Sequence, residues 1–155
     1  MLEVLVAILI LSLAALANAG LQISGLRANS SSKLRSVATA QAADMADRMR
    51  VNRAGLSAYA NASGIPTDPG CVTVSSPCSA TDMATHDIFE WNTANANSLP
   101  SGVGIVCLDN TPDPRVGLPG APACSGTGTT YSVKIWWDDS HGEKPLQLFV
   151  TNFQP

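Results

Sequence analysis

The first 65 residues of this 155-residue chain contain no proline, so no proline interrupts a helix there. The chain has no Cys-x-x-Cys and no closely spaced Cys and His pair, which argues against a zinc site. It also lacks a Gly-x-Ser-x-Gly motif and a glycine-rich loop for cradling phosphate, and His86 and His141 lie far apart in sequence. We therefore expect no catalytic residue, no metal and no cofactor, and we expect that the protein is not an enzyme.

Charge is scarce and unevenly placed. Six of the nine basic residues lie between Arg27 and Arg53 together with two acidic residues, so this stretch carries 6 − 2 = +4. From residue 54 onward three basic residues stand against nine acidic ones, a balance of 3 − 9 = −6. An acidic body argues against nucleic acid as a partner. The basic stretch either contacts anionic lipid headgroups or forms a solvated helix face, and the sequence leaves both readings open.

A long apolar run follows the first few residues of the chain. Between Val4 and Leu21 it is interrupted only by Ser12, Asn18 and Gly20. A membrane-spanning helix needs about 20 mostly apolar residues, so this run with its flanks is long enough. The alternative is a secretory signal peptide cut after Ala19, which would leave a secreted binding module. Against it, no basic residue precedes the run, the run is longer than about 7–15 residues, and Glu3 stands at its start.

The pattern beyond the apolar run predicts one long helix from near residue 2 to about Ala58. Weak helix formers gather between Gly20 and Ser32, so we expect the helix to loosen there. Further along, apolar residues recur at three- and four-residue steps, as on a buried helix face: Leu34, Val37, Ala38, Ala42, Met45 and Met49. Asp44 and Arg48, and likewise Asp47 and Arg50, place an acid before a base at helical spacing.

The rest of the chain has the pattern of a small mixed domain. Residues 61–79 form a Pro/Gly-containing loop, and Thr81 or Asp82 caps a second helix that runs to about Asn97. Three strands are expected, at residues 103–108, at residues 131–137 and from Leu146 to Val150. The second strand alternates apolar and polar residues, as a half-buried strand does, and the last two strands form a hairpin. We therefore predict an α+β fold in which a long helix packs on a small antiparallel sheet.

All four cysteines lie in the polar part of the chain, at Cys71, Cys78, Cys107 and Cys124. An even number of cysteines behind a membrane-directing start is typical of disulfides in an oxidising compartment. Three pairings are possible from sequence. We favour Cys71–Cys78 and Cys107–Cys124, because each bond closes a local loop that contains Pro or Gly.

The start of the chain resembles that of mature type IV pilins and type II secretion pseudopilins, in the stretch Met1-Leu2-Glu3-Val4-Leu5-Val6-Ala7-Ile8-Leu9-Ile10-Leu11. The resemblance places the invariant glutamate of these proteins on Glu3, which is thought to pair with the amino terminus of a neighbouring subunit. It also implies a set of membrane and filament-core residues: Leu2, Val4, Leu5, Val6, Ala7, Ile8, Leu9, Ile10, Leu11 and Leu13. In the family, a leader ending in glycine and two further residues stand ahead of Met1. The cleavage and methylation sites therefore fall on no residue of this sequence, and we expect them upstream.

A second stretch of the sequence resembles a smaller group within these proteins. Residues 43–54, with the sequence ADMADRMRVNRA, are similar to the DMADRMRANR stretch of the PilV family of minor pilins. Asp87-Ile88-Phe89-Glu90-Trp91 and Leu99-Pro100-Ser101-Gly102 extend the resemblance further along the chain. Within this family, four charged residues are either solvated helix surface or contacts to neighbouring subunits: Asp44, Asp47, Arg48 and Arg50.

The resemblance implies a minor pilin that supports pilus assembly, and with it adhesion and twitching motility. Residues 1–25 would be the membrane and filament-core part of the helix, and residues 26–155 the head, in a single domain overall. The implied partners are other minor and major pilins, the inner-membrane assembly machinery and, before assembly, the lipid bilayer. The implied location is the bacterial inner membrane, with one pass and a periplasmic head, and then the pilus. The alternatives are a minor pseudopilin of type II secretion, or a tip adhesin that binds through residues 61–79 or 109–129.

Overall fold

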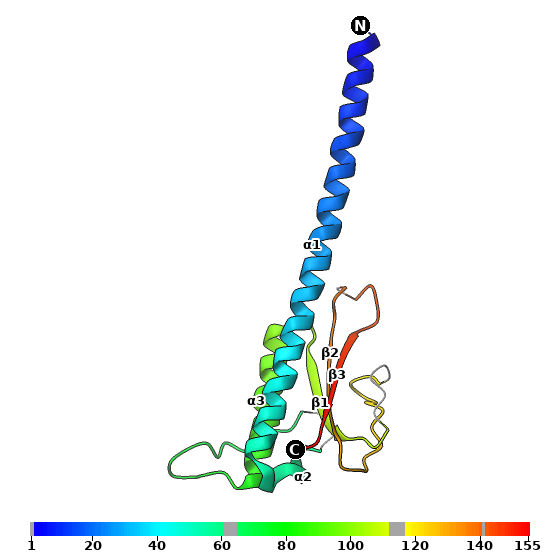
Figure 1. The fold of residues 1–155 in the computed structure, drawn as a ribbon. Coiled ribbons are helices and arrows are strands. Elements are labelled where there is room, and N and C mark those ends of the chain that lie inside the picture. The colour runs from blue at the N-terminus through cyan, green and yellow to red at the C-terminus, as the bar shows by residue number, and fades with distance from the viewer. Residues whose placement is uncertain (1, 61–64, 112–116, 141) are drawn as a thin grey trace. The chain divides into compact units, whose positions relative to one another are not determined.

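The computed structural model describes residues 2–60, 65–111, 117–140 and 142–155. The chain divides into two compact units, residues 1–34 and residues 35–155. The elements in chain order are α1 (Leu2–Val51), η1 (Arg53–Gly55), α2 (Leu56–Tyr59), α3 (Ala80–Ser98), β1 (Val103–Leu108), β2 (Tyr131–Trp137) and β3 (Gln147–Phe153) (Figure 1). A long helix combined with a small antiparallel sheet confirms the predicted α+β class.

The first unit is formed by the N-terminal part of α1. Residues 2–30 are all exposed and all helical, so the loosening expected between residues 20 and 32 is wrong. Weak helix formers cost only a few tenths of a kcal/mol each, and no proline is present to break the backbone ladder. The side chains of Ser12 and Asn18 donate to backbone carbonyls one turn earlier, so the helix itself satisfies them.

The second unit contains the C-terminal part of α1, whose buried face is lined by Ala38, Ala42, Met45, Ala46 and Met49. These residues include four of the predicted stripe, and Met45 and Met49 are fully buried. The indole Nε1 of Trp91 on α3 donates to the backbone carbonyl of Gln41 at 2.8 Å. A buried tryptophan thus joins the two helices.

The long helix ends earlier than expected, at Val51 instead of about Ala58. The chain then continues in the short helices η1 and α2. The Asn52 side chain donates to the carbonyl of Ala80 at 2.8 Å, and a Cβ on Gly55 would lie 2.3 Å from the same oxygen. After this turn the start of α3 leaves no room for a side chain at residue 55, so this position requires glycine.

The second helix of the head, α3, is capped by Ser79, and not by Thr81 or Asp82 as the sequence suggested. Ser79 has an extended backbone, and its Oγ accepts a hydrogen bond from the Asp82 amide at 3.1 Å. The Asp82 carboxylate accepts from the same hydroxyl at 2.7 Å. An acidic side chain in the first turn also suits the positive end of the helix dipole.

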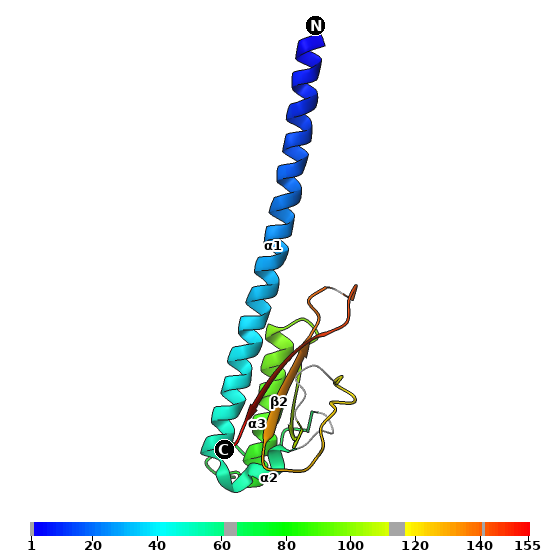
Figure 2. The ribbon, with the colours of Figure 1, turned by 45° about the vertical axis from the view of Figure 1, so that its right-hand side comes forward.

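The sheet has the strand order β1-β2-β3, and both pairs are antiparallel. In β1 and β2, Val103 lies opposite Trp136, and in the hairpin of β2 and β3, Tyr131 lies opposite Phe153. The strands expected at residues 103–108 and 131–137 are confirmed at these bounds, and the third strand begins at Gln147. The end of β3 lies beside the C-terminal part of α1 (Figure 2), where the Arg50 guanidinium stacks over the Phe153 ring at 5.5 Å.

The expectation of a half-buried central strand is wrong, because all seven residues of β2 are buried. Tyr131, on the face toward the helices, donates from its hydroxyl to the carbonyl of Leu56. On the opposite face, Lys134 Nζ donates to the carbonyls of Pro122 and Ala123, and Trp136 Nε1 donates to that of Gly117. The segment that joins β1 to β2 therefore covers the outer face, which a strand pattern alone does not reveal.

Two disulfides are present, Cys71–Cys78 and Cys107–Cys124, in the local pairing that the sequence favoured. The first staples the loop that leads into α3. The second ties β1 to the segment that covers the outer face of β2. Both bonds stabilise parts of the head that contain little regular structure of their own.

Candidate functional site

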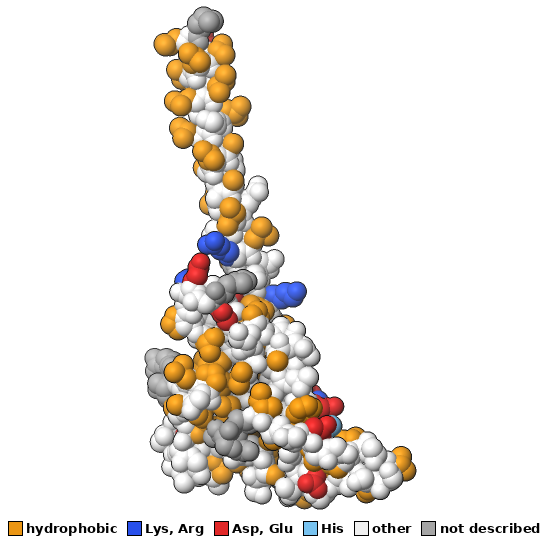
Figure 3. Space-filling view, turned by 180° about the vertical axis from the view of Figure 1, so that it is seen from behind, with side chains coloured by type: hydrophobic (Ala, Val, Ile, Leu, Met, Phe, Trp, Pro, Cys, Tyr) orange, Lys and Arg blue, Asp and Glu red, His pale blue; other side chains and the backbone are white. Residues whose placement is uncertain are grey.

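The N-terminal unit offers an apolar surface that its own chain does not cover. An 18-residue window of α1 has a mean hydropathy of 2.5, and none of it is buried. All ten predicted core residues from Leu2 to Leu13 are exposed, and Leu2 itself is 79% exposed. Figure 3 shows hydrophobic side chains all along this segment, followed by Lys and Arg side chains. Burying a leucine gains about 1.5–3 kcal/mol, so a surface of this kind requires lipid or other helices around it.

Glu3 is the acidic residue in the first turn of α1, and its side chain is exposed. A carboxylate at this position interacts favourably with the positive end of the helix dipole. In an apolar environment the same charge would cost a few kcal/mol unless a positive charge paired with it. Glu3 is the only charged residue between residues 2 and 26, so this apolar part of the helix carries a single charge.

The four charged residues singled out on α1 have two different environments. Arg50 pairs with the exposed Asp47 at 2.5 Å, and both side chains are more than half exposed. Arg48 pairs with Asp44 at 3.0 Å, as its spacing predicted, but it also reaches across to α3. It donates to Asp87 at 3.0 Å and to Glu90 at 3.1 Å. Arg48 therefore connects two elements of its own head.

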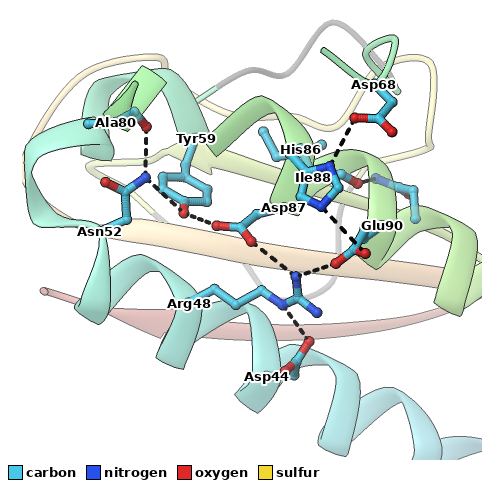
Figure 4. Close-up of polar contacts among 11 residues, drawn as sticks. Asp44, Arg48, Asn52, Tyr59, Asp68, Ala80, His86, Asp87, Ile88 and Glu90 are labelled. Atoms are coloured by element: carbon cyan, nitrogen blue, oxygen red, sulfur yellow. Dashed lines mark hydrogen bonds and ion pairs between the residues drawn. The ribbon is translucent and has the colours of Figure 1, made fainter. Parts of the chain in front are cut away.

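The contacts of Arg48 belong to a larger polar cluster between α1, α2 and α3 (Figure 4). Asp87 is 8% exposed and accepts hydrogen bonds from both the Arg48 guanidinium and the Tyr59 hydroxyl. The Asn52 side chain lies within 3.3 Å of the Tyr59 hydroxyl and also holds the start of α3 through Ala80. A buried carboxylate with a cationic and a neutral donor is well satisfied, so the cluster fixes how the helices meet.

The electrostatics of this cluster follow from its partners. Burial acts to lower the pKa of Arg48, but hydrogen bonds to Glu90 and Asp87 and the charge of Asp44 outweigh it and raise that pKa. Burial and the hydrogen bond to Asp87 both raise the pKa of Tyr59 above its usual range. Arg48 thus stays charged and Tyr59 stays neutral across the physiological pH range.

His86 attaches the loop after α2 to this cluster. Its Nδ1 lies 2.9 Å from Asp68, and its Nε2 lies 3.4 Å from Glu90. The hydrogen bond with His86 and that from the Gly70 amide lower the pKa of the Asp68 carboxyl. Because Glu90 also binds Arg48, a continuous set of contacts runs from the loop to α1.

Sequence reasoning missed Asp87 and Tyr59. The signal that could have found Asp87 is its position on α3, because it falls on the helix face that also carries Ala84, Ile88 and Trp91. A carboxylate on an apolar face predicts a buried partner, but its identity depends on tertiary packing. Over the described ranges, no group of three or more His, Cys, Asp or Glu side chains is arranged to hold a metal ion. The arrangement therefore offers structural contacts and an uncovered apolar helix.

Comparison with protein families gives one match. The family model described as "Tt1218-like: Type IV pilin Tt1218" matches residues 20–89, which include most of α1 and the first half of α3. No curated protein and no solved structure in the comparisons matches the chain. The family match, the long apolar α1 and the α+β fold support a type IV pilin-like protein.

Proposed function

We propose that the chain is a minor pilin of a type IV pilus, similar to the PilV family, which supports pilus assembly and through it adhesion and twitching motility. The observation that carries the proposal is the apolar N-terminal segment with Glu3 in its first turn, in a chain that matches a type IV pilin family. Type IV pilins are structural subunits, and their function is to be incorporated into a fibre.

The mechanism that we propose has no reaction step. Before assembly, the apolar part of α1 spans the inner membrane once, and the head with its two disulfides lies in the oxidising periplasm. During assembly this helix leaves the bilayer and enters a bundle of similar helices made by other minor and major pilins. Both environments are apolar, so the transfer costs little for the ten core residues from Leu2 to Leu13.

Glu3 makes the transfer selective. A carboxylate in the apolar fibre core is stable only beside an opposite charge, and the amino terminus of a neighbouring subunit is the available one. In type IV pilins that amino terminus is created when a prepilin leader is removed, and it is then methylated. The pair of Glu3 with this amino terminus would form only when the two subunits are correctly aligned along the fibre. Only correctly placed subunits would therefore be stabilised.

The experiment replaces Glu3 by alanine in a strain that lacks the chromosomal copy and expresses the chain with its natural upstream sequence. The matched control is Ser12→Ala, which changes a polar residue of the same segment that bonds only to its own helix. The loss of a few kcal/mol from the pair should lower incorporation at least roughly tenfold, because about 1.4 kcal/mol corresponds to a factor of ten.

The measurement is the amount of subunit in sheared pili relative to the amount in the membrane fraction. Glu3→Ala should reach the membrane at the normal level and be depleted from pili, whereas Ser12→Ala should behave like the unaltered chain. Normal incorporation of Glu3→Ala would contradict the proposal. If deletion of the gene abolished protein secretion and left pili intact, the chain would instead be a minor pseudopilin.

A further inference from the structure

The head leaves one edge of its sheet uncovered. The Asp109 amide donates to the Thr130 carbonyl at 3.0 Å, so these two residues form a hydrogen-bonded pair at the end of the β1–β2 ladder. Hydrogen-bonded and non-bonded pairs alternate in an antiparallel ladder, so the even-numbered residues of β2 are those whose backbone groups bond to β1. The odd-numbered residues of β2 therefore bond to their partners on β3, for example Val133 to Thr151. It follows that the backbone groups of Leu148, Val150 and Asn152 point away from the sheet.

At the opposite edge of the sheet, the outward backbone groups of β1 have hydrogen-bond partners. The Gly104 amide of β1 donates to the Asn92 side chain at 2.8 Å, and the Leu108 carbonyl accepts from the Gly126 amide at 3.0 Å. In the part of the chain that the structure describes, no such bond reaches the outward backbone groups of β3. The sequence of β3, QLFVTNF, also has none of the charged residues or prolines that usually protect an edge strand.

A groove runs between this edge and α1. Its volume is about 270 Å³, and it is lined by Thr39, Ala42, Ala43, Ala46, Arg50, Phe149, Thr151, Asn152 and Phe153. The helix wall consists mainly of alanines, and the strand wall carries two phenylalanines. The groove therefore combines alanine and phenylalanine side chains with the polar side chains of Thr39, Arg50 and Asn152, and the outward backbone groups of β3 lie along its strand side.

An apolar projection lies on another side of the same head. The loop stapled by Cys71–Cys78 makes a tight turn in which Thr73 and Ser76 bridge, and Val74 stands fully exposed at the tip. Val72 beside it is 58% exposed, and residues 71–79 carry no charge. Figure 1 shows this loop on the far side of α3 from the sheet, and hydrophobic side chains lie at its end in Figure 3.

We propose that the tip of this loop, with Val74 at its centre, docks into the groove between α1 and β3 of a second copy of the chain. The exposed valine at the tip suits the alanines and phenylalanines of the groove, and the outward backbone groups of β3 offer hydrogen bonds to the backbone of the docked turn. The disulfide holds the loop in shape before docking, so little conformational entropy is lost. Because the two surfaces differ, each copy still has a free groove and a free tip after pairing, and the contact can propagate.

The geometry suits copies held side by side with the same polarity. The groove extends along α1 as far as Arg50, and the loop returns to the head at Ala80, which Asn52 contacts directly. The tip and the groove therefore lie at the same end of the head. Two copies that stand side by side with the same polarity can bring the tip of one to the groove of the other. The side-by-side arrangement rests on the membrane anchoring given under the proposed function, but the contact itself needs no fibre and can be tested in its absence.

The experiment uses the full chain in detergent micelles and two single-cysteine additions on separate copies. One copy carries Val74→Cys, and the other carries Ala43→Cys on the helix wall or Thr151→Cys on the strand wall. The native cysteines are all in disulfides, so a short bismaleimide links only the added thiols. We expect both mixtures to give crosslinked dimer at least several-fold above Val74→Cys alone. Adding Val72→Asp to the Val74→Cys copy should abolish this dimer.

The matched control pairs Val74→Cys with Ser98→Cys, an exposed position at the end of α3. Equal crosslinking to Ser98 and to the groove positions would overturn the proposal, as would an absence of crosslinks in both groove mixtures. Dimers of Thr151→Cys alone would overturn it in favour of symmetric pairing between two β3 strands. Variants that elute as aggregates are replaced by a photoreactive phenylalanine at residue 74, whose adducts are mapped to groove or non-groove peptides.

Discussion

The guanidinium of Arg48 on α1 donates to the buried carboxylate of Asp87 on α3, over 3.0 Å between nitrogen and oxygen. The two residues are 39 positions apart, so the contact exists only when the helices are packed. It lies next to the Met45 and Met49 stripe, where apolar burial supplies most of the stability. Asp87 is 8% exposed, and the contact therefore determines what a change at either residue would cost.

Replacing Arg48 by alanine should destabilise the head by about 2–3 kcal/mol, because the Asp87 carboxylate would lose its only cationic hydrogen-bond donor among the described contacts. This loss is smaller than that expected for a fully buried ion pair, because Arg48 is partly exposed and its charge is screened by solvent. The measurement is urea unfolding of the full chain in detergent. Asp47→Ala is the control, since its pair with Arg50 is exposed and should contribute less than about 0.5 kcal/mol. Equal losses for the two variants would show that the Asp87 contact is unimportant.

The two tyrosines should resist ionisation at alkaline pH. Burial raises the pKa of Tyr131, and burial with the hydrogen bond to Asp87 raises the pKa of Tyr59. A pKa raised in the folded state means that stability is complete below the unfolded value of about 10 and falls as the pH rises above it. Phenolate absorbance of the native chain should therefore appear above pH 10 and together with unfolding. Tyr59→Phe should remove most of this alkaline loss, and an ordinary titration near pH 10 in the folded chain would refute the assignment.

Removing the Cys107–Cys124 bond should affect the sheet itself. The bond closes a longer loop than Cys71–Cys78, and chain entropy predicts losses of about 3 and about 2 kcal/mol respectively. The segment that joins β1 to β2 and covers the outer face of β2 would also loosen, so the indole of Trp136 would lose its hydrogen-bond acceptor, the carbonyl of Gly117. Replacing both cysteines by serine should thus red-shift tryptophan fluorescence for this pair and leave it unchanged for Cys71 and Cys78. Identical spectra for the two double variants would contradict the role of the cover.

Gly104 should tolerate no side chain. A Cβ at this position would lie 2.2 Å from the ring of Trp91, the residue that joins α3 to α1. Gly104→Ala should displace the indole and cost about 1–3 kcal/mol in unfolding free energy, as overpacking does. Gly120→Ala is the control, since nothing lies within 4 Å of a Cβ there. A neutral result for Gly104→Ala would mean that Trp91 can shift without loss of packing.

The parts of the fold that depend on local pattern were predictable. The apolar run, the stripe with Met45 and Met49 and the bounds of β1 and β2 follow from periodicity. The parts that depend on tertiary contact were not. The end of the helix at Val51 coincides with tertiary contacts of Asn52 and Gly55 with Ala80, and β2 is buried on both faces because a loop without regular structure covers one of them.

The same division holds for the candidate site. Glu3 stands out in the sequence because a carboxylate at the start of an apolar run is unusual. Arg48 was visible as a partner of Asp44, but its contact with Asp87 depends on how α1 and α3 cross. Whether Glu3 pairs with a neighbouring subunit stays a prediction, to be decided by the incorporation experiment.

The burial of Cys107 bears on when the Cys107–Cys124 disulfide can form during folding. Cys107 is 2% exposed in the folded head, so an oxidant reaches its sulfur most easily before the segment that covers the outer face of β2 is in place. Cys71 is also buried, at 8% exposed, but its bond to Cys78 closes a local loop and needs no contact with the sheet. The head is therefore complete only after its cysteines have been oxidised, and a head that lacks the Cys107–Cys124 bond should have a loosened cover over the outer face of β2.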